Sequence, residues 1–406
     1  METTTIESGS VNAAHIQKRR IESIDILRGL VMLIMAIDHT RDFLLAGHPD
    51  PVNLATTTPI LFFTRWITHF CAPTFVFLSG ISAFLAGKRR TIGQLTSFLI
   101  SRGVWLIAVE VILITFALTL DPFFNVFILQ VIWAIGGSMV LLGIMVRLKA
   151  SPYVIGITGL VIFFGHNIID VVNFGAAAKT FTWHLLLSAK GFSDYWPIGH
   201  GRGLLVPYAL LPWAGVMMVG YAFGSIYESS FDAAKRRKIL LNSGFSLLAL
   251  FLVLRFINVY GDPAPWAIQK TATMSILSFF NVTKYPCSLI YLCMTLGTAL
   301  LILALTEKVK NKFTAILIVY GNVPFFYYIC HFYLIRTINV ILFFAMGYKS
   351  SQISSPQQNP FQPNALGFNL LGLYFVWLFV IVVLYFPCRW YGRYKKTHQH
   401  WWLSYI

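Results

Sequence analysis

Charged residues are scarce in this sequence. Asp, Glu, Lys and Arg make up 11% of the 406 residues, and apolar residues make up 57%. Soluble domains contain roughly 25% and 45–50%, respectively. A soluble globule of this length could not cover its surface with so few charges, so the composition excludes an ordinary soluble protein. Acidic residues are the rarest charged class, with 15 against 31 Lys and Arg, and the formal net charge is +16.

Cysteine is scarce as well, and its placement argues against two kinds of site. The five cysteines lie in or beside apolar runs and show neither a metal-ligand spacing nor a disulfide framework. The first twelve residues are polar and lack the apolar segment of a secretory signal peptide. We expect residues 1–20 to form a disordered cytoplasmic tail and residues 21–406 to form a single transmembrane domain.

Long apolar runs are what the sequence has in abundance. Each is long enough to cross roughly 30 Å of hydrocarbon at about 1.5 Å per residue. They cover about 24–44, 59–86, 96–120, 122–147, 152–173, 204–227, 237–258, 284–306, 314–346 and 367–388. The sequence therefore predicts an all-α, polytopic integral membrane protein with about ten transmembrane helices. The ninth run is too long for one crossing, and Gly-Asn-Val-Pro at 321–324 predicts a break within it.

Basic residues cluster in every second connection between these runs. The clusters lie at 18–20, 88–90, 147–149, 235–238, 308–312 and 389–396. The positive-inside rule assigns such connections to the cytoplasm, and an even number of spans places both termini there. The external connections are then 45–58, 174–203, 259–283 and 347–366. On this topology the net positive charge suits anionic lipid headgroups and gives little reason to expect nucleic acid binding.

Polar residues gather near the external ends of five spans. Ionisable groups at membrane depth are costly and usually mark function. His39 lies between Asp38 and Asp42, as a general base would require, and His69 is a second catalytic candidate that could stabilise an oxyanion. The predicted substrate-binding residues are Arg41, Arg65, Asn167, Asp170, Asn258, Asp262, Lys284 and His331. A lone His or Arg can also join helices without a further role. No HxxxH or HExxH spacing supports a metal site.

A smaller polar set marks the cytoplasmic end. Arg28 and Arg102 could bind phosphate groups, since Arg forms bidentate bonds to phosphate. Asp25 lies three residues before Arg28, so a salt bridge at the start of the helix is the simpler alternative. Arg28 and His39 are eleven residues apart, which is about 16 Å along a helix. One helix could thus link a cytoplasmic anion site with an external imidazole.

Two sets of motifs resemble the transmembrane acyltransferase superfamily. The segment 23–29, Ser-Ile-Asp-Ile-Leu-Arg-Gly, followed by His39, is similar to the first helix of the acyltransferase-3 O-acetylases, which has a functional histidine eleven residues after its arginine. The same segment and 70–80, Phe-Cys-Ala-Pro-Thr-Phe-Val-Phe-Leu-Ser-Gly, resemble the catalytic domain of heparan-α-glucosaminide N-acetyltransferase. Uncharacterised bacterial proteins beside that second branch share further segments, which are 38–42, 65–73, 260–263, 281–286, 327–331 and 401–405.

This resemblance implies an acyltransferase that moves an acyl group, typically acetyl from cytoplasmic acetyl-CoA, to an external sugar or glycan acceptor. It also implies a location in the bacterial inner membrane and Arg28 and Arg102 as contacts for the acyl-CoA. The two branches nominate different histidines. His39 matches the O-acetylase spacing, whereas the heparan enzyme has an asparagine there and a catalytic histidine about eleven residues later, near His48. We favour His39, acting either as a general base or as an acyl carrier.

Other function classes stay open at this point. A transporter or flippase for a small anion or a lipid-linked sugar would also need buried charges, although no internal repeat of the kind found in secondary transporters is visible. A purely structural or sensory membrane protein is the third reading. The sequence names neither the acceptor nor the acyl chain, and it does not decide between a monomer and a homodimer.

Overall fold

The computed structural model describes residues 21–404 except 173, 175–179, 188–194 and 355–359. The predicted tail at 1–20 lies outside the described residues. The main helices and strands are α1 (Glu22–Leu44), α2 (Pro59–Trp66), η1 (Ile67–Phe70), α3 (Cys71–Gly87), α4 (Ile92–Val109), η2 (Glu110–Ile114), α5 (Thr115–Thr119), β1 (Val126–Ile128), α6 (Val131–Arg147), α7 (Pro152–Gly165), η3 (His166–Asp170), α8 (Phe181–Leu186), β2 (Tyr195–Gly199), β3 (Arg202–Leu205), α9 (Leu210–Phe223), η5 (Gly224–Tyr227), α10 (Ala233–Ile257), α11 (Ala272–Phe280), α12 (Leu289–Thr306), α13 (Lys312–Gly321), α14 (Pro324–Ala345) and α15 (Leu370–Thr397).

The predicted all-α polytopic membrane fold is confirmed. In the described part of the chain, eight helices or joined helices are long and apolar enough to cross a membrane. Two predicted spans correspond to the shorter α6 and to α1, and α13 is the first part of the ninth run. α6 and α13 are apolar but shorter, and α1 has 23 residues with six charged side chains. The predicted break in the ninth run is also confirmed, because α13 ends at Gly321 and α14 begins at Pro324.

Short polar side chains set where several helices begin. The Thr91 hydroxyl accepts from the backbone N–H of Gln94, whose side chain accepts from the Thr91 N–H in return. Asp232 caps α10 and Ser288 caps α12 in the same manner, each accepting a backbone N–H of the first turn. These side chains satisfy donors that have no partner inside the helix, so the start of each span is fixed locally.

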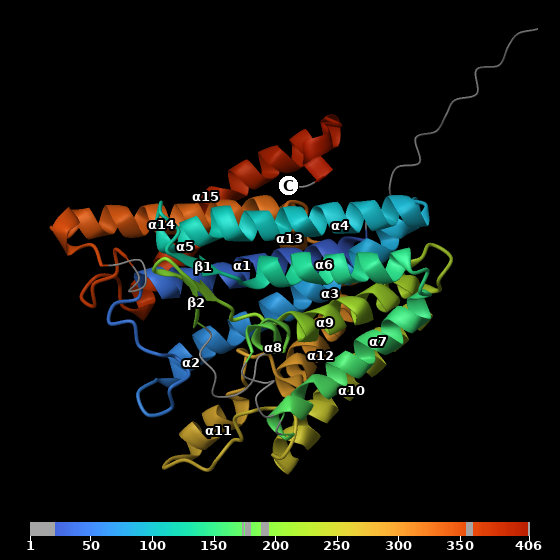
Figure 1. Cartoon of the computed structure of the whole chain (residues 1–406), viewed down its shortest axis with the longest axis horizontal. Coiled ribbons are helices and arrows are strands. Elements are labelled where there is room, and N and C mark those ends of the chain that lie inside the picture. Colours follow the sequence, from blue (N-terminus) through green and yellow to red (C-terminus); the bar gives the residue numbers. More distant parts are fainter. Residues whose placement is uncertain (1–20, 173, 175–179, 188–194, 355–359, 405–406) are drawn as a thin grey trace, which may run out of the picture.

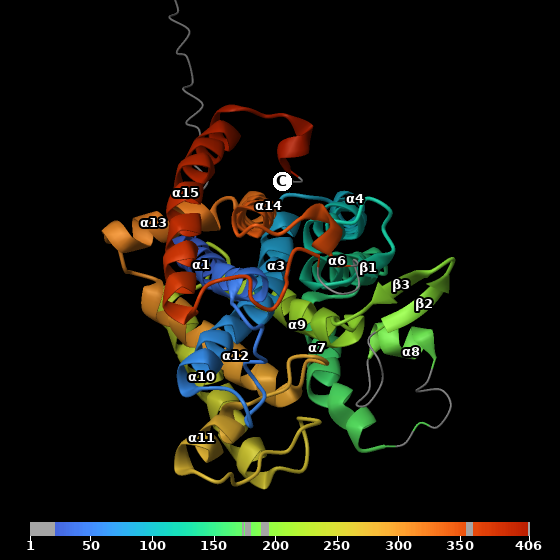
Figure 2. The same cartoon turned by 90° about the vertical axis from the view of Figure 1, so that its left-hand side faces the viewer.

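α1 lies at the centre of the bundle and packs against α3, α12, α13, α14 and α15. Figures 1 and 2 show α1 and α3 surrounded by the remaining helices, with the short strands at one end of the bundle. α1 and α13 approach very closely. A Cβ added to Gly29 would lie 1.9 Å from the carbonyl oxygen of Leu317, and one added to Gly321 would lie 1.9 Å from that of Asp25. Only glycine permits this backbone contact.

The fourth predicted span starts later than expected. The sequence predicts a helix from 122, whereas α6 begins at Val131. Residues 120–130 instead return along α5, where the Thr115 hydroxyl accepts from the Ile128 N–H, and they include β1. β1 pairs in parallel with β3, and β3 pairs in antiparallel with β2. The helix α6 therefore covers residues 131–147 of the predicted span, and the first nine residues of that span, 122–130, are not helical.

Candidate active site

A chamber of about 560 Å³ lies beside the short strands, which line it with Val126, Ile128, Tyr195 and Leu205. Its described lining combines ionisable, aromatic and amide side chains from α1, α3, α5, the β1–α6 connection, β2 and the loop before α12. The polar lining residues are Asp38, His39, Arg41, Asp42, His48, Asp50, Thr68, Thr119, Gln130, Tyr195, Tyr208, Lys284, Tyr285 and Gln362. We call this the outer chamber. Of the predicted substrate-binding residues, Arg41 and Lys284 line it.

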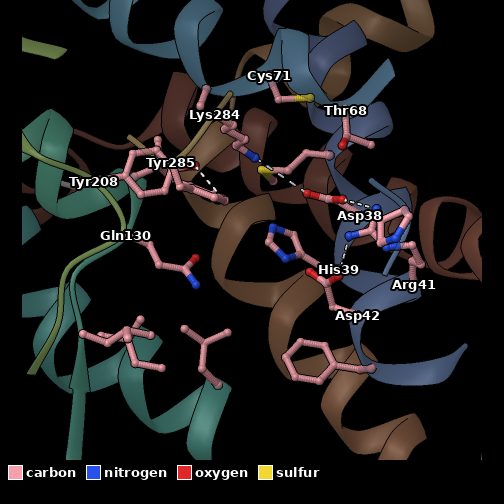
Figure 3. Close-up of a pocket in the computed structure, with 18 of the residues that line it drawn as sticks. Asp38, His39, Arg41, Asp42, Thr68, Cys71, Gln130, Tyr208, Lys284 and Tyr285 are labelled. Carbon is pink, nitrogen blue, oxygen red and sulfur yellow. Dashed lines mark hydrogen bonds and ion pairs between the residues drawn. The ribbon is translucent and has the colours of Figure 1, made fainter. Parts of the chain in front are cut away.

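His39 is one wall of the outer chamber. Its ring is packed against Phe332, with centroids 4.2 Å apart, and against His331, with centroids 5.2 Å apart. Figure 3 shows the imidazole facing the cavity, with Gln130, Tyr208 and Tyr285 across from it. The two α14 rings therefore hold the imidazole from behind while its edge remains accessible to a substrate.

The predicted carboxylate–imidazole pair is absent among the described residues, because both carboxylates bind arginine. Asp38 Oδ1 lies 2.8 Å from Arg41 Nη1, and Asp38 Oδ2 lies 3.1 Å from Arg65 Nη1 and 3.8 Å from Lys284 Nζ. Asp42 pairs with Arg41 as well. Helical spacing placed Asp38 near Arg41, but the contacts to Arg65 and Lys284 come from segments distant in the sequence. Three cations thus surround one buried carboxylate at the chamber wall (Figure 3).

His48 lines the same chamber from the loop after α1. Its backbone is left-handed, with φ of 41°, and burial lowers the pKa of its imidazole. Both histidines nominated by the sequence therefore face one cavity. The two side chains differ in how firmly they are positioned. His39 belongs to α1 and packs against the rings of His331 and Phe332, whereas His48 lies in a turn.

His69 and His331 are buried behind the chamber and are not among its lining residues. His69 is 3% exposed; its backbone carbonyl accepts from the Tyr291 hydroxyl and its ring stands edge-on to the Tyr291 ring. The Nδ1 of His331 lies 3.1 Å from the Tyr327 carbonyl oxygen and its ring supports His39. Arg65, also predicted to bind substrate, is not among the lining residues, and it contacts two that are, Asp38 and Thr68.

Four other predicted substrate-binding residues lie outside the described lining of the chamber and join parts of the protein. The Asn167 side chain binds Asp170 and accepts from the Leu289 N–H. The Asn258 side chain binds both the N–H and the carbonyl of Trp266. Asp262 accepts from the Thr283 and Ser288 hydroxyls. These contacts hold the segments before α12 in place, so we leave the four residues out of the proposed substrate site.

A second cavity, of about 460 Å³, lies further along α1 towards its N-terminus. Arg28 and Arg102, the predicted phosphate-binding pair, both line it, together with Lys395, Ser79, Ser82, Asn322 and Tyr328. Arg28 also donates to Asp25, to the Gly321 carbonyl and to Ser82. The salt bridge to Asp25 is therefore present, and the role of Arg28 in phosphate binding stays a prediction. The remaining lining is apolar and includes Met32, Phe98, Leu106, Ile132, Ile135 and Phe325. We call this the inner cavity.

The outer chamber and the inner cavity share two wall residues, Phe75 on α3 and Val131 at the first turn of α6. Met35 lines one and Met32 lines the other, one turn apart on α1. The start of α6 is fixed by Glu110, which is fully buried and accepts from the Trp133 N–H. The two cavities are therefore neighbours along α1, separated by little more than the Phe75 side chain and the first turn of α6.

Several cavity residues were not singled out from the sequence. Gln130 is an isolated polar residue inside an apolar run, and that isolation could have marked it. Lys395 belongs to a basic cluster explained by topology, so nothing distinguished it. No group of three His, Cys, Asp or Glu residues suited to a metal occurs in the described ranges.

Comparison with known families gives one match. A family model described as heparan-α-glucosaminide N-acetyltransferase, catalytic, matches residues 20–256, which is more than half of the chain. The matched region runs from α1 through almost all of α10 and contains Arg28, His39 and Arg102. No curated protein matches the chain.

Proposed function

The chain belongs to the family of the heparan-α-glucosaminide N-acetyltransferase catalytic domain, and on that premise we propose that it transfers an acetyl group from acetyl-CoA in the inner cavity to a sugar or glycan acceptor in the outer chamber. The family supports a membrane acetyltransferase in general. The donor, the acceptor, the residues and the direction are specific to this proposal.

The observation that carries the proposal is the pair of adjoining cavities along α1. One has an imidazole with access to a polar chamber, the other has arginines in an otherwise apolar pocket, and they meet at Phe75 and Val131. Transfer between two substrates that enter from opposite ends requires such an arrangement. A purely structural bundle would have no use for it.

The lining of the inner cavity suits an acyl-CoA. Arg28, Arg102 and Lys395 supply cationic donors for phosphate groups, and the apolar side chains suit the slender arm that ends in the thioester. Arg28 and His39 are about 16 Å apart along α1, a distance that an extended arm can span. The positive-inside rule supports an opening of this cavity to the cytoplasm, and the resemblance to bacterial proteins supports a location in the bacterial inner membrane.

The chemistry then follows from the placement of His39. A neutral imidazole accepts the proton of the acceptor amine or hydroxyl as that atom attacks the thioester carbonyl. The C–S bond breaks, and the imidazolium returns the proton to the departing thiolate, so that CoA leaves as a thiol. Phe332 and His331 fix the ring orientation. Lys284 and Arg41 keep the chamber cationic, which favours the negative charge that develops on the carbonyl oxygen.

The experiment compares the two histidines of the outer chamber. Protein reconstituted in liposomes is assayed for release of the CoA thiol from acetyl-CoA with a glucosamine-terminated acceptor, for wild type, His39→Ala and His48→Ala. We expect at least a 100-fold loss for His39→Ala and less than a threefold change for His48→Ala, with all three proteins monodisperse in gel filtration. Full activity of folded His39→Ala would remove the assignment. Movement of labelled sugar across the bilayer without any thiol release would favour a transporter.

A further inference from the structure

β1 separates the outer chamber from a groove on the outside of the bundle. Side chains of a strand point alternately to its two faces. Val126 and Ile128 line the outer chamber, whereas Phe127 between them lines the groove. The groove has a volume of about 450 Å³ and is bordered by Val111, Ile112, Pro122, Phe123, Phe124, Phe127 and Arg202. We call it the lateral groove.

The lateral groove lies on an exposed, apolar side of a candidate membrane span. Val111 and Ile112 belong to the span that runs from Ile92 to Thr119, and the π-helical turn η2 at this point widens the helix surface. Ile112 is 55% exposed and Phe123 is 73% exposed. The rings of Phe124 and Phe127 stack with centroids 6.0 Å apart, and both line the groove. An apolar, aromatic groove in this position suits a hydrocarbon chain.

Arg202 is the charged residue in this otherwise apolar lining. It lies on β3, its side chain is exposed, and it has neither an ion pair nor a side-chain hydrogen bond with any residue that the structure describes. A guanidinium beside the lipid-facing side of a span is costly unless an anion or water accompanies it. Its planar donors match a phosphate in bidentate geometry. The groove therefore combines a place for a hydrocarbon chain with a place for a phosphate.

The same small sheet borders both the groove and the outer chamber. Leu205, three residues after Arg202 on β3, lines the chamber, and three residues of strand span about 10 Å. Tyr195, which pairs with Leu205 across the sheet, also lines the chamber. A group attached to a phosphate at Arg202 would thus reach the chamber over the edge of this small sheet.

We propose that the lateral groove binds the acceptor as a glycolipid, a sugar linked through a phosphate to a hydrocarbon chain. The chain lies in the groove, the phosphate contacts Arg202, and the sugar enters the outer chamber from the side. This rests on the proposed function, and it names the class of acceptor. A soluble glycan would have no use for the groove.

A binding measurement tests the groove without requiring activity. The protein is titrated with polyprenyl phosphate in detergent, and the bound fraction is measured by native mass spectrometry. We expect Arg202→Ala to weaken binding about tenfold and Lys270→Ala to leave it unchanged, since Lys270 is an exposed cation of another predicted external loop. Equal binding by all three proteins would overturn the proposal. So would equally tight binding of phosphatidylglycerol, because the groove would then hold bulk lipid.

An acetylation assay tests the acceptor class. Wild type is given acetyl-CoA with either a glucosamine-terminated oligosaccharide or the same oligosaccharide linked to polyprenyl phosphate. We expect kcat/KM to be at least tenfold higher for the lipid-linked form, and this advantage to be lost in Arg202→Ala. Equal use of both acceptors would overturn the glycolipid while leaving the acetyltransferase intact. Absence of any His39-dependent transfer would instead overturn the proposed function, and the binding result would still stand.

Discussion

Arg65 Nη1 lies 3.1 Å from Asp38 Oδ2 and joins α2 to α1 at the wall of the outer chamber. The same carboxylate also forms ion pairs with Arg41 and Lys284. Asp38 therefore joins α1, α2 and the loop before α12 through ion pairs. We infer that its negative charge stabilises the fold. This relationship explains why the carboxylate next to His39 does not bind its imidazole.

The first prediction concerns that carboxylate. Asp38→Asn removes the anion that Arg41, Arg65 and Lys284 share, and breaking a buried ion pair costs about 3–5 kcal/mol. We expect the Tm of the detergent-solubilised protein, followed by gel filtration after heating, to fall by more than 5 °C. Asp42→Asn is the matched control, since the side chain of Asp42 is 47% exposed and that of Asp38 is 11% exposed. Equal Tm values for the two variants would contradict the role of Asp38.

The second prediction concerns the contact between α1 and α13. A Cβ at Gly29 would lie 1.9 Å from the backbone oxygen of Leu317, and backbone cannot move aside as a side chain can. We expect Gly29→Ala to abolish folded protein in gel filtration. Gly93→Ala is the control, because Gly93 is also helical but has nothing within 4 Å of the added Cβ. That variant should be as stable as wild type or up to about 1 kcal/mol more stable.

The third prediction concerns the donor. Arg102 lines the inner cavity, and a hydrogen bond to a charged group contributes about 1.5–3 kcal/mol. We expect Arg102→Ala to raise the KM for acetyl-CoA at least tenfold with kcat within threefold of wild type. Arg147→Ala, which removes an exposed arginine at the end of α6, should change neither parameter. A lowered kcat with unchanged KM would mean that Arg102 acts elsewhere than in donor binding.

The arrangement of the spans could be predicted from the sequence because each depends on a long, continuous signal. Apolar length and the Gly-Asn-Val-Pro break at 321–324 are local features, and the helices follow them. The start of α6 could not be predicted in this way. Residues 122–131 are apolar enough for a helix, and a short apolar run does not distinguish a strand from a helix. The contact of Thr115 with Ile128 decides the outcome, and it depends on the neighbouring helix.

The candidate site, like the fold, could be predicted from the sequence only where the signal is local. Helical spacing placed His39 and Arg28 on one central helix, and each lines a cavity. The partners of Asp38 could not be predicted, because Arg65 and Lys284 come from segments 27 and 246 residues away. Asn258 and Asp262 are polar residues near one membrane face, as expected, but their hydrogen bonds are used to order the loop before α12. A polar residue in a membrane span has some role that keeps it there. Only its contacts in the folded protein show whether that role is structural or catalytic.

The last prediction concerns Phe75, the aromatic residue shared by the outer chamber and the inner cavity. Its ring stands where the acyl group would pass, so its size should limit the length of that group. We expect Phe75→Leu to raise the ratio of kcat/KM for butyryl-CoA over acetyl-CoA at least tenfold, since a methylene in a fitted apolar pocket is worth roughly 10–200-fold.

Phe77→Leu provides the control for this experiment. Phe77 lies two residues along α3, is 2% exposed and packs edge-on against Phe223, and it lines neither cavity among the described residues. Its replacement removes the same ring from the same helix, so it should lower the Tm and leave the selectivity unchanged. If both variants keep the wild-type selectivity, the acyl group does not pass Phe75, and the two cavities do not form one transfer path.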